Sequence, residues 1–182
     1  MSGQKSHGFT IFFTGLSSSG KSTTSELVDA RLQEILNRLV TVLDGDEVRQ
    51  HLSAELGFTK EGRDANVRRI GYVASLITKH GGIAICSSIA PYREARREVR
   101  EMVEQYGSFI EVYMATSLEE CERRDVKGLY AKARAGEVER FTGVSDPYEQ
   151  PEQPELRINT EGLAPEQSCE LVIEALGKLG HL

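Results

Sequence analysis

The stretch Gly15-Leu-Ser-Ser-Ser-Gly20-Lys21-Ser22 matches the phosphate-binding loop pattern G-x-x-x-x-G-K-[ST] at every fixed position. The apolar residues 10–13 before it predict a buried strand, and a helical pattern follows from about residue 21 to residue 37. In this strand–loop–helix context the glycines let backbone N–H groups point at phosphate oxygens, and the helix adds the positive end of its dipole. Pattern and context therefore favour a phosphate site over an ordinary Gly/Ser-rich turn.

The loop also assigns roles to individual residues. We expect Lys21 to reach the β- and γ-phosphates as a catalytic residue, and Ser22 to bind Mg²⁺. ATP is thus the predicted co-substrate and Mg²⁺ the predicted cofactor. The predicted ATP-binding residues of the loop are Gly15, Ser18, Ser19, Gly20, Lys21, Ser22 and Thr23.

Length and charge narrow the class of protein. A chain of 182 residues predicts one domain spanning 1–182, and the net charge of −6 disfavours a general nucleic-acid-binding surface. No apolar run approaches membrane-spanning length and the polar N-terminus does not resemble a signal peptide, so we expect no membrane contact and a cytoplasmic location. The cysteines Cys86, Cys121 and Cys169 are too widely spaced to suggest a disulfide framework or a zinc site.

Arginines crowd the middle of this acidic chain, and two interpretations stay open. They could bind a small anionic ligand, or they could pair with glutamates on helix surfaces, which we expect to account for more than half of them. The residues concerned are Arg63, Arg68, Arg69, Arg93, Arg96, Arg97 and Arg100, with Glu61, Glu94, Glu98 and Glu101 as the expected partners.

Strand-like and helix-like patterns alternate along the chain. Such alternation predicts a three-layer α/β fold, in which a five-stranded parallel sheet carries helices on both faces. Ligands of such sheets bind at the carboxyl ends of the strands, so the residues directly after each strand should hold the site. The predicted strands are 9–14, 40–43, 83–87, 109–114 and 156–159, and the predicted helices lie near 21–37, 47–56, 64–80, 93–106, 117–124 and 165–179.

Residues 125–154 interrupt the alternation, because they are rich in glycine, proline and charge and contain no convincing strand. A long insertion without secondary structure in a compact domain is either disordered or functional. Phosphotransferases need a cover that keeps water away from the γ-phosphate. We therefore interpret residues 125–148 as a lid segment rather than a passive loop.

The loop alone does not distinguish GTPases, ATP-driven motors and small-molecule kinases. A guanine-reading N-K-x-D motif is absent, and Asp125-Val-Lys-Gly128 fits the D-x-x-G pattern only after a predicted helix rather than a strand. The chain is also too short for a motor or a membrane transporter subunit. Of the three classes, the sequence therefore favours a kinase that transfers a phosphoryl group to a small molecule.

The carboxylates of the predicted site follow the second strand, in Asp44-Gly45-Asp46, whereas the third strand, 83–87, ends without the carboxylate that often assists Mg²⁺. Gly45 permits a sharp turn that would aim Asp46 at the site. There Asp46 would orient the acceptor hydroxyl, take its proton or hold Mg²⁺ through water. The alternative is that Asp46 caps a helix beginning near Glu47, and one residue can do both.

Several longer motifs extend far beyond the loop. On these motifs the chain resembles the adenylylsulfate kinase family from about residue 8 to residue 180, and the string Asp125-Val-Lys-Gly-Leu-Tyr130 is far more specific than the phosphate loop. The motifs are Gly15-Leu-Ser-Ser-Ser-Gly-Lys-Ser-Thr23, Leu43-Asp-Gly-Asp46, Leu56-Gly-Phe58, Arg63-x-x-Asn66-x-x-Arg69-Ile70, Pro91-Tyr-Arg93, Glu122-Arg-Arg-Asp125-Val-Lys-Gly-Leu-Tyr130-x-Lys132-Ala-Arg134-Ala-Gly136 and Phe141-Thr-Gly-Val-x-Asp-Pro-Tyr148-Glu.

The resemblance implies a phosphate-loop kinase fold and a particular reaction. In this family MgATP phosphorylates the 3′-hydroxyl of adenosine 5′-phosphosulfate (APS), giving ADP and 3′-phosphoadenosine 5′-phosphosulfate (PAPS), the activated sulfate donor. A homodimer and a functional pairing with ATP sulfurylase are further expectations of the resemblance. Another small-metabolite kinase of the same fold and a nucleotide-binding module without catalysis are the alternatives.

The family's substrate residues carry over where the motifs match. Asp46 would lie by the 3′-hydroxyl and the metal, Lys127 would reach the phosphates as the lid closes, and Arg124 would border the ATP adenine. The predicted metal ligands are Ser22 and Asp46, and the predicted catalytic residues are Lys21, Asp46 and Lys127. The predicted APS-binding residues are Asp46, Arg49, Phe58, Arg63, Asn66, Ile89, Ala90, Lys127, Arg140 and Phe141, of which Arg49, Arg63 and Asn66 would hold the phosphosulfate and ribose.

Phe58 and Phe141 would clamp the APS adenine between two rings. Phe58 could equally belong to the core, whereas Phe141 lies in a polar segment that favours an exposed ring. Three positions depart from the family pattern: Ser18 replaces the usual glycine, Glu47 the usual asparagine and Ala90 the usual serine. Ser18 would be strained if its position needs positive φ. Ala90 has no hydroxyl to carry a phosphoryl group, so we expect direct in-line transfer from ATP to the acceptor.

Overall fold

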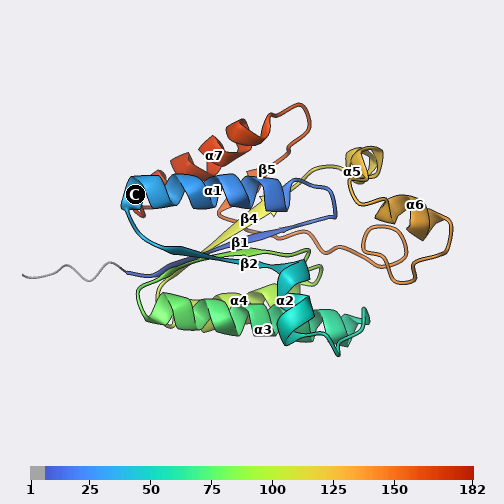
Figure 1. The fold of residues 1–182 in the computed structure, drawn as a ribbon, viewed down its shortest axis with the longest axis horizontal. Coiled ribbons are helices and arrows are strands. Elements are labelled where there is room, and N and C mark those ends of the chain that lie inside the picture. Colours follow the sequence, from blue (N-terminus) through green and yellow to red (C-terminus); the bar gives the residue numbers. More distant parts are fainter. Residues whose placement is uncertain (1–6) are drawn as a thin grey trace, which may run out of the picture.

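The sheet is built around β1 (Phe9–Gly15), which is buried along its whole length and pairs in parallel with a strand on each side. In the computed structural model, which describes residues 7–182, five parallel strands follow the order β2-β3-β1-β4-β5 (Figure 1). The predicted five-stranded parallel sheet is confirmed, with nearly the predicted bounds. The other strands are β2 (Val40–Asp44), β3 (Ile83–Ser87), β4 (Ser108–Met114) and β5 (Leu156–Ile158).

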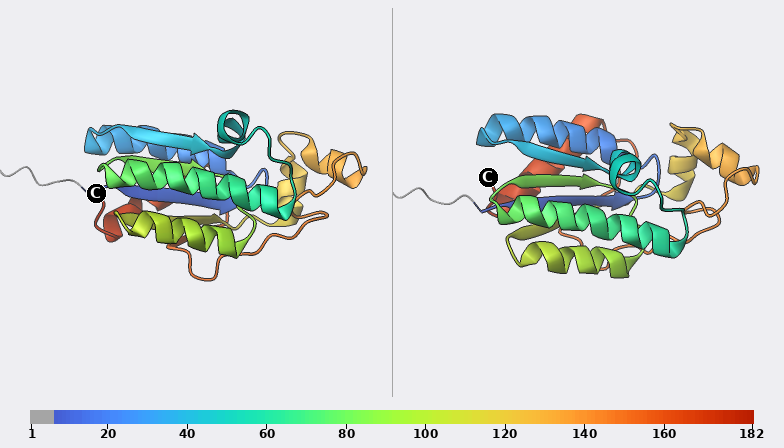
Figure 2. Two further views of the ribbon diagram at one scale, coloured as in Figure 1. Left: turned by 90° about the horizontal axis from the view of Figure 1, so that it is seen from below. Right: turned by 60° about the horizontal axis from the view of Figure 1, so that its bottom comes forward.

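One pair of helices covers each face of the sheet, as the alternation predicted (Figure 1, Figure 2). Side chains point to alternate faces of a strand, so β1 supplies both cores: Ile11 and Phe13 pack on one face and Phe12 on the other. Among the described residues no helix is long and apolar enough to span a bilayer, and the cytoplasmic location stays a prediction. The first face carries α1 (Lys21–Leu36) and α7 (Pro165–Lys178), and the second carries α3 (Lys60–Lys79) and α4 (Arg93–Glu104).

Shorter helices gather at the carboxyl ends of the strands (Figure 1), and one of them was not predicted. The expectation that residues 125–148 lack secondary structure is wrong, because Asp125 accepts hydrogen bonds of 3.0 Å from the backbone N–H groups of Tyr130 and Ala131 and so starts a helix. Six residues are too few to show a helical period in the sequence. These helices are α2 (Gly45–Leu52), α5 (Leu118–Arg124) and α6 (Leu129–Arg134).

The lid segment, residues 125–148, has a small apolar core shared with the end of α5. Cys121, Tyr130, Ala133 and Phe141 are buried together, and Leu16 of the phosphate loop packs against them. The lid is therefore a folded element that rests on the loop, and its position depends on side chains from both.

α3 and α4 approach each other closely at Gly71 of α3, which faces Val99 of α4. A Cβ atom added at Gly71 would lie 2.4 Å from Cγ2 of Val99, which is closer than two carbon atoms can approach without a shift. The missing side chain thus sets the separation of the two helices. This matters for the site, because α3 carries the predicted residues Arg63 and Asn66.

We expect Gly71→Ala to be less stable than Gly177→Ala, although both remove a glycine from a helix. Either change gains up to about 1 kcal/mol of helix propensity, but Gly177 has no neighbouring atom within 4 Å of its added Cβ. Overpacking costs about 1–3 kcal/mol, so urea unfolding should separate the two variants by about that amount. Val99→Ala should cost less in the Gly71→Ala background than alone; equal costs would show that Val99 is not the obstacle.

Candidate active site

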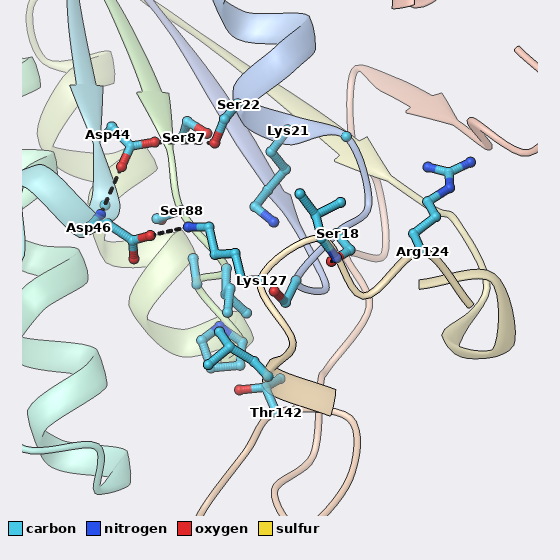
Figure 3. Close-up of a pocket in the computed structure, with 18 of the residues that line it drawn as sticks. Ser18, Lys21, Ser22, Asp44, Asp46, Ser87, Ser88, Arg124, Lys127 and Thr142 are labelled. Atoms are coloured by element: carbon cyan, nitrogen blue, oxygen red, sulfur yellow. Dashed lines mark hydrogen bonds and ion pairs between the residues drawn. The ribbon is translucent and has the colours of Figure 1, made fainter. Parts of the chain in front are cut away.

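A cavity of about 760 Å³ opens at the carboxyl ends of the strands, between the phosphate loop, α2, the loop after β3 and the lid (Figure 3). This is the edge of the sheet at which the sequence predicted the site. Two predicted residues do not line it, because Gly15 and Ser19 are buried within the loop and shape its backbone instead. The predicted residues that do line it are Ser18, Gly20, Lys21, Ser22, Thr23, Asp46, Arg49, Phe58, Arg63, Asn66, Ile89, Ala90, Arg124, Lys127, Arg140 and Phe141.

The phosphate loop joins β1 to α1 with the backbone that its glycines allow. Gly20, the residue before α1, has φ +96°, in the left-handed region that glycine tolerates. Ser18 has φ +60°, so the serine at this position is in a strained conformation. Its hydroxyl oxygen accepts a hydrogen bond of 3.3 Å from the backbone N–H of Val126, which links the loop to the lid.

Lys21 is buried at the start of α1, where its ammonium group donates a hydrogen bond of 2.7 Å to the backbone carbonyl of Leu16. Burial lowers the pKa of Lys21 to about 8, because the charged form loses its hydration and the nearby carboxylates of Asp44 and Asp46 compensate only in part. A bound anion would favour the charged form. The loop therefore holds a lysine whose positive charge is only partly balanced by its neighbours, at the place where a phosphate is expected.

Asp44, and not Asp46, caps the helix that follows β2. The Asp44 carboxylate accepts hydrogen bonds from the backbone N–H groups of Asp46 at 2.9 Å and Glu47 at 3.4 Å, and α2 begins at Gly45. The alternative that Asp46 is a helix cap is therefore wrong. Its side chain is 74% exposed and forms an ion pair with Lys127 of the lid (Figure 3). Two predicted catalytic residues thus meet directly.

Ser22 and Asp44 place two oxygen ligands side by side next to the loop (Figure 3). The Ser22 hydroxyl donates a hydrogen bond of 3.2 Å to the second carboxylate oxygen of Asp44. Such oxygens suit Mg²⁺ when phosphate and water complete its shell, and residues 7–182 contain no cluster of three His, Cys, Asp or Glu side chains that could hold a metal without them. The sequence placed Asp44 among the carboxylates of the site but named Asp46 as the metal ligand. In the sheet Asp44 is the neighbour of Ser87, where β3 lacks the expected carboxylate.

Arg49, Arg63 and Phe58 form one wall of the cavity. The guanidinium carbons of Arg49 and Arg63 lie 4.6 and 5.5 Å from the centroid of the Phe58 ring. Phe58 is 56% exposed, so the alternative that it belongs to the core is wrong. Two guanidinium groups beside one exposed ring can bind anionic oxygens and a flat base together.

Phe141 shows the opposite behaviour. It is only 8% exposed, and its ring packs edge-on against Tyr130 with 4.9 Å between the ring centroids. The prediction of an exposed ring is wrong, because the polar sequence around Phe141 conceals the small apolar core of the lid. Phe141 nevertheless lines the cavity from the lid side.

Several buried polar atoms along the cavity have no hydrogen-bond partner within residues 7–182. They are Oδ1 of Asn66 and the hydroxyl oxygens of Ser87, Ser88 and Thr142. Buried polar groups in folded proteins are nearly always hydrogen-bonded, to protein, ligand or ordered water, so these atoms can bind a polar group that enters the cavity. Of the four residues, only Asn66 was predicted from the sequence.

Arg124 lies on the far side of Lys21 from Asp46 (Figure 3). Its guanidinium group donates to the hydroxyl of Thr160 at 2.8 Å and to the carbonyl oxygen of the same residue at 3.0 Å, and pairs with Glu120 at 2.8 Å. Held in this way, it lines the cavity as a fixed planar surface. The segment after β5 also lines this end, as expected for residues that directly follow a strand, through Thr160, Gly162, Leu163 and Pro165.

Known proteins resemble the chain over most of its length. A family model described as adenylylsulphate kinase matches residues 7–159. The chain is 53% identical over 175 residues to an adenylyl-sulfate kinase of Halothermothrix orenii, which covers 96% of this chain and 92% of that protein. A solved structure of the Mycobacterium tuberculosis APS kinase in complex with AMPPNP and APS matches with a TM-score of 0.89 and 42% identity, covering 94% of this chain and 98% of that chain. A sulfate adenylyltransferase of Chaetomium globosum is 49% identical over 154 residues, which cover 85% of this chain but 27% of that protein.

We expect the affinity for a non-hydrolysable ATP analogue to fall as pH rises above about 8, the pKa of Lys21 in the free protein. The triphosphate raises this pKa on binding, so the association constant should drop by up to about tenfold per pH unit, with proton uptake. Calorimetry between pH 7 and 9.5 measures both. Lys21→Arg keeps its charge over this range and should flatten the profile. A flat wild-type profile would show either that Lys21 stays protonated over this range in the free protein or that it does not meet the phosphates.

Proposed function

The chain belongs to the adenylylsulphate kinase family, and we propose that its cavity transfers the γ-phosphoryl group of ATP to the 3′-hydroxyl of APS, giving PAPS and ADP. The observation that carries the proposal is that one cavity contains both the Lys21 ammonium group of the phosphate loop and the Asp46 carboxylate, which no helix cap engages. A kinase needs a phosphate site and an acceptor-activating group in one shared space. This cavity supplies both.

The donor half of the cavity takes ATP. The loop backbone and Lys21 receive the β- and γ-phosphates, and Lys21 stabilises the charge that develops during transfer. The adenine lies against the guanidinium group of Arg124, which Glu120 and Thr160 hold in place. A planar cation can stack on the face of a flat base without hydrogen bonds to the edge of that base.

Ser22, as predicted, and Asp44, in place of the predicted Asp46, are the residues that would hold Mg²⁺. The support is their contact of 3.2 Å beside the loop, with no competing ion pair on Asp44 within residues 7–182. Mg²⁺ supplies charge neutralisation at the β- and γ-phosphates when it is bound. This divides the two carboxylates by role: Asp44 serves the metal, and Asp46 serves the acceptor.

The acceptor half takes APS. Asp46 orients the 3′-hydroxyl and accepts its proton, and Lys127, now paired with Asp46, is placed to turn toward the transferring phosphoryl group. Arg49 and Arg63 bind the phosphosulfate, because a guanidinium fork matches two anionic oxygens at once. The adenine lies against Phe58, with Phe141 closing from the lid. Asn66, Ile89, Ala90 and Arg140 complete this half.

The transfer is direct, in one ternary complex. Ala90 offers no hydroxyl at the position where a phosphoenzyme would form, so the phosphoryl group passes from ATP to the acceptor oxygen with both substrates bound. The alternative nucleophile to test first is Ser88, which lines the cavity and whose buried hydroxyl has no partner among the described residues.

Two wider proposals rest on the family. Pairing with ATP sulfurylase is supported by the Chaetomium globosum sulfate adenylyltransferase, of which this chain matches about a quarter. A homodimer stays a prediction. We also propose that residues 1–182 act as one catalytic domain whose lid is residues 125–148.

Coupled ADP release with a panel of acceptors tests the reaction. We expect turnover with APS at micromolar concentration and none with gluconate or nucleoside monophosphates, because only APS places its anionic oxygens on Arg49 and Arg63 while its hydroxyl meets Asp46. Initial-rate lines for the two substrates should intersect. ATP binding without turnover of any acceptor would indicate a non-catalytic module. Parallel lines, with label passing from γ-labelled ATP to the protein and then to APS, would indicate a phosphoenzyme.

We expect Asp44→Asn and Asp46→Asn to fail in different ways. Asparagine caps a helix as well as aspartate, so Asp44→Asn should leave the melting temperature nearly unchanged while weakening Mn²⁺ binding to the ADP complex by about 10–100-fold. Asp46→Asn should lower kcat by about 10²-fold or more with little effect on metal or ATP binding. Electron paramagnetic resonance of Mn²⁺ and steady-state kinetics measure the two effects; exchanged phenotypes would reverse the assignment.

A further inference from the structure

Arg96 of α4 is buried outside the cavity, where it contacts three separate parts of the chain. It is 3% exposed, and its guanidinium group donates to the Glu111 carboxylate of β4 at 2.9 Å, to the carbonyl oxygen of Ala90 at 2.5 Å and to the carbonyl oxygen of Glu149 at 2.6 Å. Glu111 is sufficient to balance the charge of Arg96. The two hydrogen bonds to backbone carbonyls therefore indicate a further role for this side chain.

The first of these carbonyls belongs to the wall of the acceptor half. Ala90 has φ +43°, in the left-handed region that a residue with a Cβ atom rarely adopts, and it is 2% exposed. With Ile89 it lines the cavity. Its carbonyl oxygen accepts a hydrogen bond from Arg96, and the carbonyl oxygen of the preceding residue, Ile89, accepts one of 2.7 Å from the hydroxyl of Thr14. The strained backbone persists because its surroundings fix it.

The second carbonyl belongs to the segment by which the chain leaves the lid. Glu149 donates its backbone N–H to the carbonyl of Pro91 at 2.8 Å, and its carboxylate accepts the backbone N–H of Arg93 at 2.8 Å. The preceding residue, Tyr148, shares a hydrogen bond of 2.9 Å with Thr14. Arg96 thus joins the wall of the acceptor half, at the Ala90 carbonyl, to the segment that follows the lid, at the Glu149 carbonyl.

We propose that Arg96 is a positioning residue for APS. It holds the Ile89–Ala90 backbone in its strained conformation and fixes the end of the lid against it, so the acceptor wall is formed before APS binds. The proposal rests on the proposed function. The donor half lies elsewhere, since Figure 3 places Ser88, at the start of the same loop, beside Asp46 and away from Arg124. Arg96 therefore acts on the acceptor and not on ATP.

Arg96→Lys tests the proposal, because lysine keeps the charge for Glu111 but cannot reach two carbonyls with one rigid fork. We expect the KM for APS and the dissociation constant of APS, measured by calorimetry, to rise about tenfold, the effect of losing one hydrogen bond from a charged donor. The KM for ATP should change less than about twofold. The matched control is Arg97→Lys, because Arg97 is an exposed neighbour paired with Glu94.

A double-mutant cycle separates positioning from mere stability. Glycine adopts positive φ without strain, so Arg96→Lys should weaken APS binding less in an Ala90→Gly background than alone. If Arg96→Lys does not fold, Thr14→Val replaces it. Valine has nearly the volume of threonine but removes the hydroxyl that holds the Ile89 carbonyl, so it should also raise the KM for APS several-fold.

Equal increases in both KM values, or a lower melting temperature with both KM values unchanged, would overturn the proposal and leave Arg96 a structural residue. The absence of coupling in the cycle would overturn it as well. Wild-type turnover of APS is measured first. Its absence would instead overturn the proposed function, so the two failures are distinct.

Discussion

The carboxylate of Asp44 joins the two halves of the cavity. One oxygen caps α2 through the backbone N–H groups of Asp46 and Glu47, and the other accepts a hydrogen bond from Ser22 at the start of α1. The cap leaves the Asp46 side chain free to enter the cavity. Parallel pairing of β2, β3 and β1 brings the ends of these strands to one edge, so a single side chain sets the donor loop and the acceptor carboxylate at a fixed separation.

Most of the central arginines serve structure rather than the ligand. All of them pair with acidic residues, but only Arg68 and Arg97 pair with glutamates that the sequence named, so the expected helix-surface pairing accounts for fewer than half of the group. Arg63 is the member of the group that lines the cavity, where Arg49 joins it. Several partners are distant in sequence, which is why helix spacing did not reveal them. The pairs are Arg68–Glu98, Arg69–Glu55, Arg93–Glu152, Arg96–Glu111, Arg97–Glu94 and Arg100–Glu155.

The lid contacts both halves of the cavity at once. Val126 donates to Ser18 of the phosphate loop, Lys127 pairs with Asp46, and Arg63 donates to the carbonyl of Arg140. Opening the lid must therefore break contacts on the donor and acceptor sides together. A substrate in either half would change the free energy of that opening, because it competes for the same side chains.

The sequence by itself determined the phosphate loop, the parallel sheet and the edge that holds the site, because these follow from local signals: a glycine pattern, strand–helix alternation and the fixed direction of parallel strands. The motifs also identified the family and nearly half of the residues that line the cavity. Only the tertiary structure decided that Asp44 and not Asp46 caps α2, that Phe58 is exposed while Phe141 is buried, and that Arg96 holds the Ala90 carbonyl. Each of these depends on contacts between segments far apart in the chain, or on which of two equivalent carboxylates reaches a backbone N–H, and no local pattern records either.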